Sequence, residues 1–281
     1  MPRASELPPP PPPLPVSVVD AHTHLDACGA THPSGVRAAL DRAAAVGVAA
    51  VVTVADDMAA ARWVVQAARW DKRVFAAVGL HPTRTAGMTG AERAELDRLA
   101  RDPRVVAVGE TGLDYYWDYS PHKAQQEAYR WHIDLAKRLS KPLMIHDRDA
   151  HEDVLAVLEQ EGSPATVVLH CFSGDAAMAR ACVDAGYILS FSGTVTFRNA
   201  KALREAALLV PNEQLLVETD APYLTPHPHR GRRNEPVNLP YTIRDLAALR
   251  GQDIAELAAS SRAAAERVFG FTIEVPPPRS A

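Results

Sequence analysis

Several features that mark common protein classes are missing from this chain. Three cysteines in 281 residues are too few for a disulfide scaffold. No apolar run reaches the roughly 18 residues that a transmembrane helix needs. The chain also lacks the Gly-x-x-x-x-Gly-Lys-Ser/Thr loop, the Gly-x-Ser-x-Gly elbow and a glycine-rich dinucleotide loop. We therefore exclude a P-loop nucleotide triphosphatase, a serine hydrolase of the elbow type and a Rossmann dehydrogenase.

An excess of positive charge is also missing. The 30 Lys and Arg residues are outnumbered by 34 Asp and Glu residues, which gives a net charge of −4. A protein that coats nucleic acid through a broad basic surface is therefore excluded, although a local basic patch beside a cleft is compatible with this charge. A hydrophobic content of 47% and a charged content of 23% are typical of a soluble globular protein.

The two ends of the chain differ from the middle. Residues 1–15 are rich in proline and are expected to form a disordered or polyproline II extension, and residues 273–281 are expected to form a flexible tail. The remaining residues, 16–272, are expected to form one domain. The start of the chain has no apolar stretch of the kind found in secretory signals, so a cytoplasmic location is expected. Cys28, Cys171 and Cys182 are interpreted as small buried residues.

Short apolar runs alternate with longer amphipathic stretches along the middle of the chain. The runs lie near 16–19, 49–54, 74–79, 105–109, 142–145, 166–169, 187–190 and 214–217. Helical patterns lie at 35–46, 57–70, 91–101, 121–139, 149–160, 174–185 and 199–209, with one or two more helices in 238–270. The runs are apolar on both faces, as strands buried on both sides are. Eight such repeats predict an α/β fold, a single (β/α)₈ TIM barrel.

Six side chains of metal-ligand type stand where apolar runs end. They are His22, His24, Glu110, His146, His170 and Asp220. A barrel of parallel strands brings the carboxyl ends of all its strands to one mouth. The six residues therefore predict one metal site at the C-terminal ends of the strands, and such a site indicates a hydrolase.

Residues two apart on a strand share a face, so His22 and His24 are expected to point together into the barrel. The eighth strand neighbours the first in a closed barrel, which places Asp220 beside this pair as a ligand and as the acceptor of a proton from water. Asp20 is expected to orient one of the imidazoles, and Glu218 is expected to lie below and bind the ligands through hydrogen bonds.

Glu110 ends the fourth run, and its two carboxylate oxygens suit it to bridge two cations. His146 and His170 end the fifth and sixth runs and are expected to bind the second cation. We therefore expect two divalent ions. Imidazole favours Zn²⁺ or Mn²⁺ over Mg²⁺, but the sequence does not decide among the three.

Groups that could contact a substrate surround these positions. His81 follows the third run and is expected to donate a hydrogen bond to the substrate or leaving group. Arg148 follows His146 by two residues and is a candidate phosphate ligand. The loop after the eighth run adds Arg230, Arg232 and Arg233. For these arginines a solvated loop without function is an equally good interpretation.

Seven strings together resemble the TatD family of metal-dependent hydrolases, a branch of the amidohydrolase-like barrels. They are Asp-Ala-His-Thr-His-Leu-Asp (20–26), Gly-Leu-His-Pro (79–82), Gly-Glu-Thr-Gly-Leu-Asp-Tyr (109–115), Ile-His-Asp-Arg (145–148), His-Cys-Phe-Ser-Gly (170–174), Glu-Thr-Asp-Ala-Pro-Tyr-Leu (218–224) and Arg-Gly-Arg-Arg-Asn-Glu-Pro (230–236). They occur in family order across roughly residues 18–270.

The resemblance implies a division of the ligands between two metals. His22, His24, Glu110 and Asp220 would hold one ion, and Glu110, His146 and His170 the other. It also implies a cytoplasmic deoxyribonuclease, often a 3′-to-5′ exonuclease on single-stranded DNA. In the mechanism expected here, a metal-activated hydroxide attacks phosphorus, Asp220 takes its proton and His81 assists the leaving oxygen.

Other functions remain open at this point. The same metal pair could serve an amidohydrolase that acts on a small amide, lactone or phosphotriester, but Glu110 stands where such enzymes use a carbamylated lysine. Cleavage of an aminoacyl ester on tRNA is a second enzymatic alternative. A scaffold that binds partners through its proline-rich start is the non-enzymatic one. The oligomeric state is open as well, with a monomer compatible with the sequence.

Overall fold

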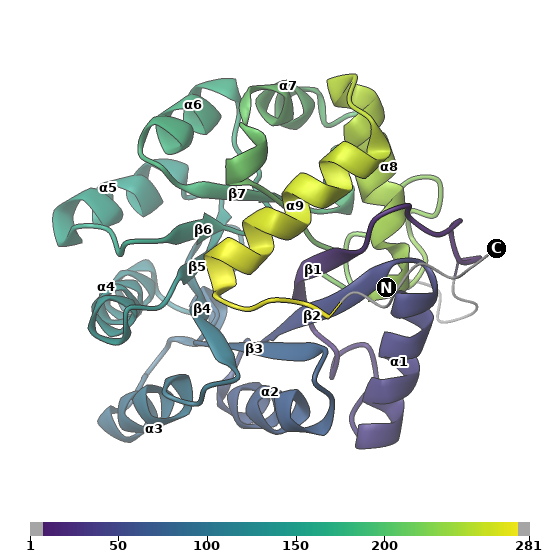
Figure 1. Cartoon of the computed structure of the whole chain (residues 1–281). Coiled ribbons are helices and arrows are strands. Elements are labelled where there is room, and N and C mark those ends of the chain that lie inside the picture. Colours follow the sequence, from purple (N-terminus) through teal and green to yellow (C-terminus); the bar gives the residue numbers. More distant parts are fainter. Residues whose placement is uncertain (1–7, 275–281) are drawn as a thin grey trace.

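A computed structural model describes residues 8–274 of the chain. Its eight strands form one parallel sheet in which each strand pairs with the next in sequence, and Figure 1 shows them ringed by helices. The strands are β1 Val18–Thr23, β2 Val48–Val54, β3 Val74–Val78, β4 Val105–Asp114, β5 Leu143–Arg148, β6 Val167–Leu169, β7 Ile188–Phe191 and β8 Leu215–Val217. The expected (β/α)₈ barrel is confirmed.

The helices follow the strands in strict alternation until the end of the chain, where two occur in succession. They are α1 Pro33–Ala45, α2 Met58–Trp70, α3 Gly90–Ala100, α4 His122–Leu139, α5 His151–Glu161, α6 Ala176–Asp184, α7 Lys201–Leu209, α8 Leu239–Arg250 and α9 Ile254–Phe269. Short 3₁₀ turns lie at η1 Pro82–Arg84, η2 Gly193–Thr196, η3 Asn212–Gln214 and η4 Pro236–Asn238. The expected closing segment is therefore two helices.

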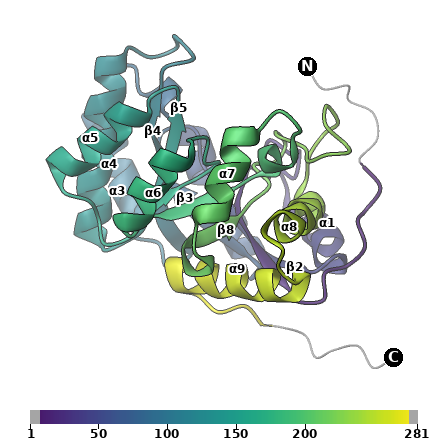
Figure 2. The same ribbon diagram turned by 90° about the horizontal axis from the view of Figure 1, so that it is seen from above.

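The core has two layers. An outer layer packs the helices against the strands, and an inner layer fills the barrel with side chains such as Ala77, Met144 and Leu216. The inner layer continues into Val268 and its neighbours on α9, and Figure 2 shows α9 lying across one end of the barrel. Because α9 covers that end, the opposite end, where the strands terminate, is left for a site.

The barrel closes between β8 and β1 at this opposite end. The backbone N–H of Asp220 donates to the carbonyl of His22 at 2.9 Å, and that of His24 donates to Ala221 at 2.7 Å. A parallel bridge between Thr23 and Ala221 accompanies these bonds. The closure therefore sets Asp220 beside the two histidines of the first strand, as the sequence predicts.

Two strands depart from regular register where they carry candidate ligands. The pairing of β1 with β2 shifts between Asp20 and Thr23, and that of β4 with β5 shifts between Val108 and Thr111. Such bulges change the direction of side chains and are common beside active sites. After its shift β4 continues to Asp114, five residues beyond the predicted end of that strand.

The proline-rich start of the chain follows the polyproline II alternative of the two expected, but it is packed against the domain. Residues 1–7 lie outside the described residues, but from residue 8 every third side chain is buried, at Pro8, Pro11 and Leu14. This period is that of a polyproline II helix, which has three residues per turn. Tyr241 and Arg244 of α8 donate hydrogen bonds of 2.9–3.0 Å to the proline carbonyl oxygens. Residues 8–15 are therefore a packed strap.

The other end of the chain also packs further than expected. Ile273 is buried in the inner layer, and its N–H donates to the carboxylate of Glu266 at 2.9 Å. Glu274 forms an ion pair with Lys72. The expected flexible tail therefore does not include residues 273 and 274, and its remainder, 275–281, lies outside the described residues. Within the described range no helix is long and apolar enough to cross a membrane.

A substitution at Gly112 of β4 tests whether β4 and β5 lie too close together for a side chain at this position. It has φ +128°, and a Cβ atom there would lie 2.1 Å from the carbonyl oxygen of His146. We expect Gly112→Ala to lower the free energy of unfolding by about 3 kcal/mol, through strain and overlap. Thermal denaturation should then show a melting temperature lower by about 6–12 °C.

Gly90→Ala is the matched control, because Gly90 begins α3 and a Cβ atom there meets nothing within 4 Å. This variant should melt no lower than the unchanged protein. Equal melting temperatures for the two variants would contradict the constraint at Gly112.

Candidate metal centre

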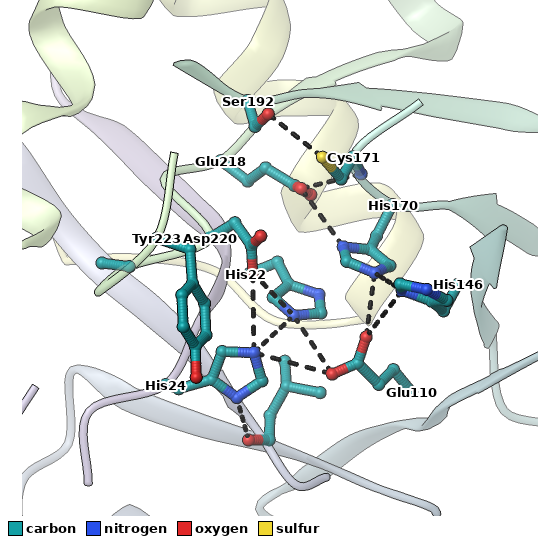
Figure 3. Close-up of polar contacts among 12 residues, drawn as sticks. His22, His24, Glu110, His146, His170, Cys171, Ser192, Glu218, Asp220 and Tyr223 are labelled. Atoms are coloured by element: carbon teal, nitrogen blue, oxygen red, sulfur yellow. Dashed lines mark hydrogen bonds and ion pairs between the residues drawn. The ribbon is translucent and has the colours of Figure 1, made fainter. Parts of the chain in front are cut away.

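The six candidate ligands converge at the mouth of the barrel (Figure 3). They lie within β1, β4 and β5 or directly after β1, β6 and β8, so residues up to 198 positions apart in sequence meet in one cluster of polar atoms. All but two are buried; the exceptions are His146 and Asp220, whose side chains are 17% and 13% exposed. Three groups have ligand atoms that all lie within 4.8 Å of one another: His22, His24 and Asp220; His22, Glu110 and His170; and His81, Asp114 and His146.

The first half of the cluster has the dimensions of a tetrahedral cation site. The Nε2 atoms of His22 and His24 lie 3.2 Å apart. Both lie 3.5–3.8 Å from Oδ1 of Asp220 and Oε1 of Glu110. A tetrahedral site with bonds of about 2.0–2.1 Å places its ligand atoms roughly 3.3–3.4 Å apart. These four atoms therefore fit a divalent cation at their centre.

The second half shares Glu110 with the first. Its other carboxylate oxygen, Oε2, lies 2.9 Å from Nε2 of His170 and 3.5 Å from Nδ1 of His146. The two imidazole nitrogens are 3.3 Å apart. Three atoms at these separations form one face of a second site, and one oxygen of Glu110 faces each half.

Three of the four imidazoles are held from behind through their other ring nitrogen. A carbonyl or carboxylate that accepts the ring N–H leaves the lone pair of the opposite nitrogen directed into the cluster, as in many metal sites. These pairs are His24 Nδ1 with Val54 O (3.0 Å), His146 Nε2 with Asp114 Oδ2 (3.0 Å) and His170 Nδ1 with Glu218 Oε1 (3.3 Å). The inner nitrogens of these three rings are therefore positioned to bind a cation.

Two carboxylates below the cluster were expected to orient ligands, and they behave differently. Glu218 does contact a candidate ligand: besides His170, it accepts hydrogen bonds from Cys171 N (2.7 Å) and Ser190 Oγ (2.5 Å). Asp20 instead binds the backbone N–H and hydroxyl of Thr219 at 2.9 and 2.6 Å. Because Asp20 contacts no imidazole, its expected role is wrong, and it ties β1 to the end of β8.

The charges of the cluster also favour a cation. Burial by itself acts to raise the pKa of Glu110, but the neighbouring His170 and His81 hold that pKa well below its usual range. Burial acts to lower the pKa of His24, yet the adjacent Asp220 and Glu110 carboxylates raise it to about 9. Two carboxylates in so small a volume therefore attract positive charge, which a proton or a metal ion can supply.

His81 lies at the edge of the cluster, with its ring 4.3 Å from the ring of His146. Its Nδ1 accepts the backbone N–H of Thr83 at 3.2 Å, so the proton of the neutral ring sits on Nε2. Burial, together with the neighbouring His146, lowers the pKa of His81 to about 3. His81 is therefore a neutral hydrogen-bond donor.

The predicted substrate arginines lie outside the cluster. Arg148 is exposed and its guanidinium lies 4.0 Å from the ring centre of Tyr116, while Arg230 lies 4.4 Å from that of Phe197. The structure brings none of them into contact with the six ligands. Within residues 8–274 none of the four forms an ion pair with a carboxylate, so their charges are not neutralised locally. The four are Arg148, Arg230, Arg232 and Arg233.

Sequence reasoning missed Asp114, which binds His146 and also accepts two backbone N–H groups of the following loop, at Tyr116 and Trp117. Its signal was present as the carboxylate four residues after Glu110 in the same string. Cys28 and Cys182 are buried as expected, but Cys171, next to His170, is only partly buried. Burial raises the pKa of the Cys171 thiol well above its usual range, which disfavours the thiolate that a nucleophile needs.

Comparison with known proteins agrees with the site. A family model described as TatD related DNase matches residues 19–270. A protein of Mycobacterium tuberculosis strain H37Rv, named uncharacterized metal-dependent hydrolase TatD, is 63% identical over 260 residues, covering 90% of this chain and 98% of the relative. A protein of Erwinia amylovora, named 3′-5′ ssDNA/RNA exonuclease TatD, is 38% identical over 203 residues, covering 70% and 78%.

Among solved structures, the Escherichia coli TatD homologue YjjV superposes with a TM-score of 0.84 at 30% identity, covering 91% of this chain and 98% of that one. The family match spans most of the chain and includes every strand that carries a candidate ligand. The chain therefore belongs to the TatD family of metal-dependent hydrolases.

Proposed function

We propose that this protein is a divalent-metal-dependent deoxyribonuclease that removes nucleotides from the 3′ end of single-stranded DNA. The observation that carries the proposal is the pair of adjacent ligand sets that share Glu110, at the open mouth of the barrel. Paired cations of this kind are typical of enzymes that hydrolyse phosphodiesters. The relative named as an exonuclease on single-stranded DNA and RNA supports the substrate class.

The residues divide between two ions in this proposal. His22, His24, Glu110 and Asp220 hold one, and Glu110, His146 and His170 hold the other; Zn²⁺, Mn²⁺ and Mg²⁺ are the candidates. Bound divalent cations would supply Lewis-acid stabilisation of the phosphoryl oxygens and lower the pKa of water at the site.

Asp220 is the residue that we propose as proton acceptor. Its carboxylate is 13% exposed, whereas that of Glu110 is 4% exposed, so water from the mouth reaches Asp220 more readily. In the proposed step a water oxygen attacks phosphorus in line with the leaving oxygen, and Asp220 receives the proton that this water loses. The backbone bond from Asp220 to His22 keeps the acceptor in place.

His81 and the arginines act on the substrate in this proposal. The Nε2–H of the neutral His81 donates a hydrogen bond to the oxygen of the departing nucleotide. Arg148 and the three arginines of the 230–233 loop offer charge to phosphates that flank the reacting one. The loop follows β8 and therefore lies on the mouth side of the barrel.

We also propose that the working unit is one barrel domain, residues 16–272, in the cytoplasm. The strap of residues 8–15 belongs to its packing. All three cysteines are free, which suits a reducing compartment. The amidohydrolase and scaffold alternatives receive less support, because Glu110 occupies the bridging position and the six ligand-type side chains are all present.

Cleavage of labelled single strands tests the activity. With a 3′ label, we expect release of labelled mononucleotide at once, and with a 5′ label a ladder that shortens gradually, because digestion starts at the 3′ end. A chelator or Glu110→Gln should reduce the rate by at least about a thousandfold, the scale on which removal of essential active-site groups acts. Gel electrophoresis of DNA and RNA strands under each metal gives the measurement.

Glu205→Gln is the matched control, since Glu205 lies exposed on α7 and away from the mouth. Its rate should equal that of the unchanged protein. Undiminished cleavage in Glu110→Gln, or in chelator, would refute the proposed centre, and a 5′-labelled mononucleotide as first product would refute the polarity.

Metal content tests the two-ion assignment without reference to activity. We expect two divalent ions per chain in the purified protein, because two ligand sets are present. His24→Ala and His170→Ala should each retain about one ion, since each removes a ligand from one set only. Inductively coupled plasma mass spectrometry gives the count.

His32→Ala serves as the comparison variant, because His32 is exposed before α1 and its side chain makes no capping bond. It should retain both ions. Loss of both ions from each single-site variant, or of neither, would contradict two separable sites.

A further inference from the structure

Aromatic side chains are concentrated in the loop between β4 and α4. The chain has only four tryptophans, seven tyrosines and six phenylalanines, yet four of these rings fall within residues 115–119. Three of the four are exposed to solvent: Tyr116 at 53%, Trp117 at 41% and Tyr119 at 67%. Exposure of three large rings in one short loop is costly in water, so packing of the fold does not explain them.

The rings form an ordered surface, which we call the aromatic platform: Tyr116, Trp117, Tyr119 and Arg148. The rings of Trp117 and Tyr119 are stacked, with centres 5.5 Å apart and planes 12° apart. Tyr116 meets Trp117 edge to face at 4.8 Å, and the guanidinium of Arg148 lies 4.0 Å from the centre of Tyr116. The platform therefore combines flat apolar faces with a positive charge.

The platform is attached directly to the metal centre. Oδ1 of Asp114 accepts the backbone N–H groups of Tyr116 and Trp117, both at 3.0 Å, and Oδ2 of the same carboxylate lies 3.0 Å from the His146 ring. Arg148 follows His146 by two residues on β5, so both lie on the same face of that strand. One carboxylate thus fixes a candidate ligand and the platform together.

We propose that the aromatic platform stacks the bases of a single-stranded nucleic acid and so holds the nucleotides next to the one being removed. This inference rests on the proposed function and names how that site retains its substrate. Stacking on exposed rings beside an arginine is the usual way in which proteins bind single strands without reading their sequence. A chain of net charge −4 offers little general attraction for DNA, so stacking of bases would add to the phosphate contacts of the few local arginines.

Equilibrium binding of two oligonucleotides tests the platform. One is oligothymidylate, and the other has the same backbone with tetrahydrofuran abasic units, which have phosphates but no bases. The full-length Glu110→Gln chain is the parent, because it should bind without cutting. We expect it to bind oligothymidylate about tenfold more tightly than the abasic strand, measured by fluorescence anisotropy.

Variants of the loop then separate stacking from loop structure. Trp117→Ala should weaken binding of oligothymidylate about tenfold and leave binding of the abasic strand unchanged, and Trp117→Phe should restore most of the loss. Asp118→Asn is the matched control in the same exposed loop and should bind oligothymidylate as tightly as the parent.

The outcomes that overturn the platform are distinct from those that overturn the nuclease. Equal binding of the two strands by the parent, or equal weakening of both by Trp117→Ala, would refute base stacking. Sedimentation that shows Trp117→Ala dissociating an assembly, with unchanged DNA binding, would assign the rings to an interface between copies. Base-dependent binding by the Glu110→Gln chain, together with no cleavage of any strand by the unchanged protein under each metal, would refute the proposed function and leave the platform standing.

Discussion

A buried negative charge is the constraint on which the mouth of this barrel depends. The carboxylate of Glu110 is 4% exposed and stays ionised among imidazoles, so its charge has to be balanced inside the protein. Each of its two oxygens faces a separate group of nitrogens. Without this carboxylate, the imidazoles around it would lose the one group that they all contact. A second carboxylate at the same place would add repulsion between two buried negative charges. The arrangement of the histidines around two sides of one carboxylate follows from this side chain.

The surrounding structure orients the imidazoles around that carboxylate. Asp114, Glu218 and the carbonyl of Val54 each contact the outer nitrogen of one imidazole, so the inner nitrogens face the space beside Glu110, where a proton or a cation can lie between them and the carboxylate. These holders come from β4, the end of β8 and β2, so the orientation of each ring depends on the relative position of two strands. Rigid strands, more than the loops above them, therefore set the geometry of the centre.

Much of this could be predicted from the sequence, for a physical reason. Residues such as His170 follow apolar runs directly, and a parallel barrel brings the ends of all its strands together, so the ligands could be grouped without knowing any distance. The bulges in β1 and β4 could not be predicted, because they depend on pairing with neighbours and leave no pattern in the strand itself. The burial of Pro8, Pro11 and Leu14 depends on α8, which lies more than two hundred residues away. Asp20 was misassigned because its partner Thr219 comes from the far end of the chain.

The seam between β8 and β1 joins the first strand to the last and also passes through the candidate centre. Within the described residues these two strands share a single bridge, at the mouth, and the backbone bonds around it belong to His22, His24 and Asp220. The place where the barrel is least firmly closed is thus the place where its chemistry is proposed to occur. The same short segments thus supply backbone groups that join the first strand to the end of the last and side chains that face the centre, so a backbone shift at this seam would move His22, His24 and Asp220 relative to one another.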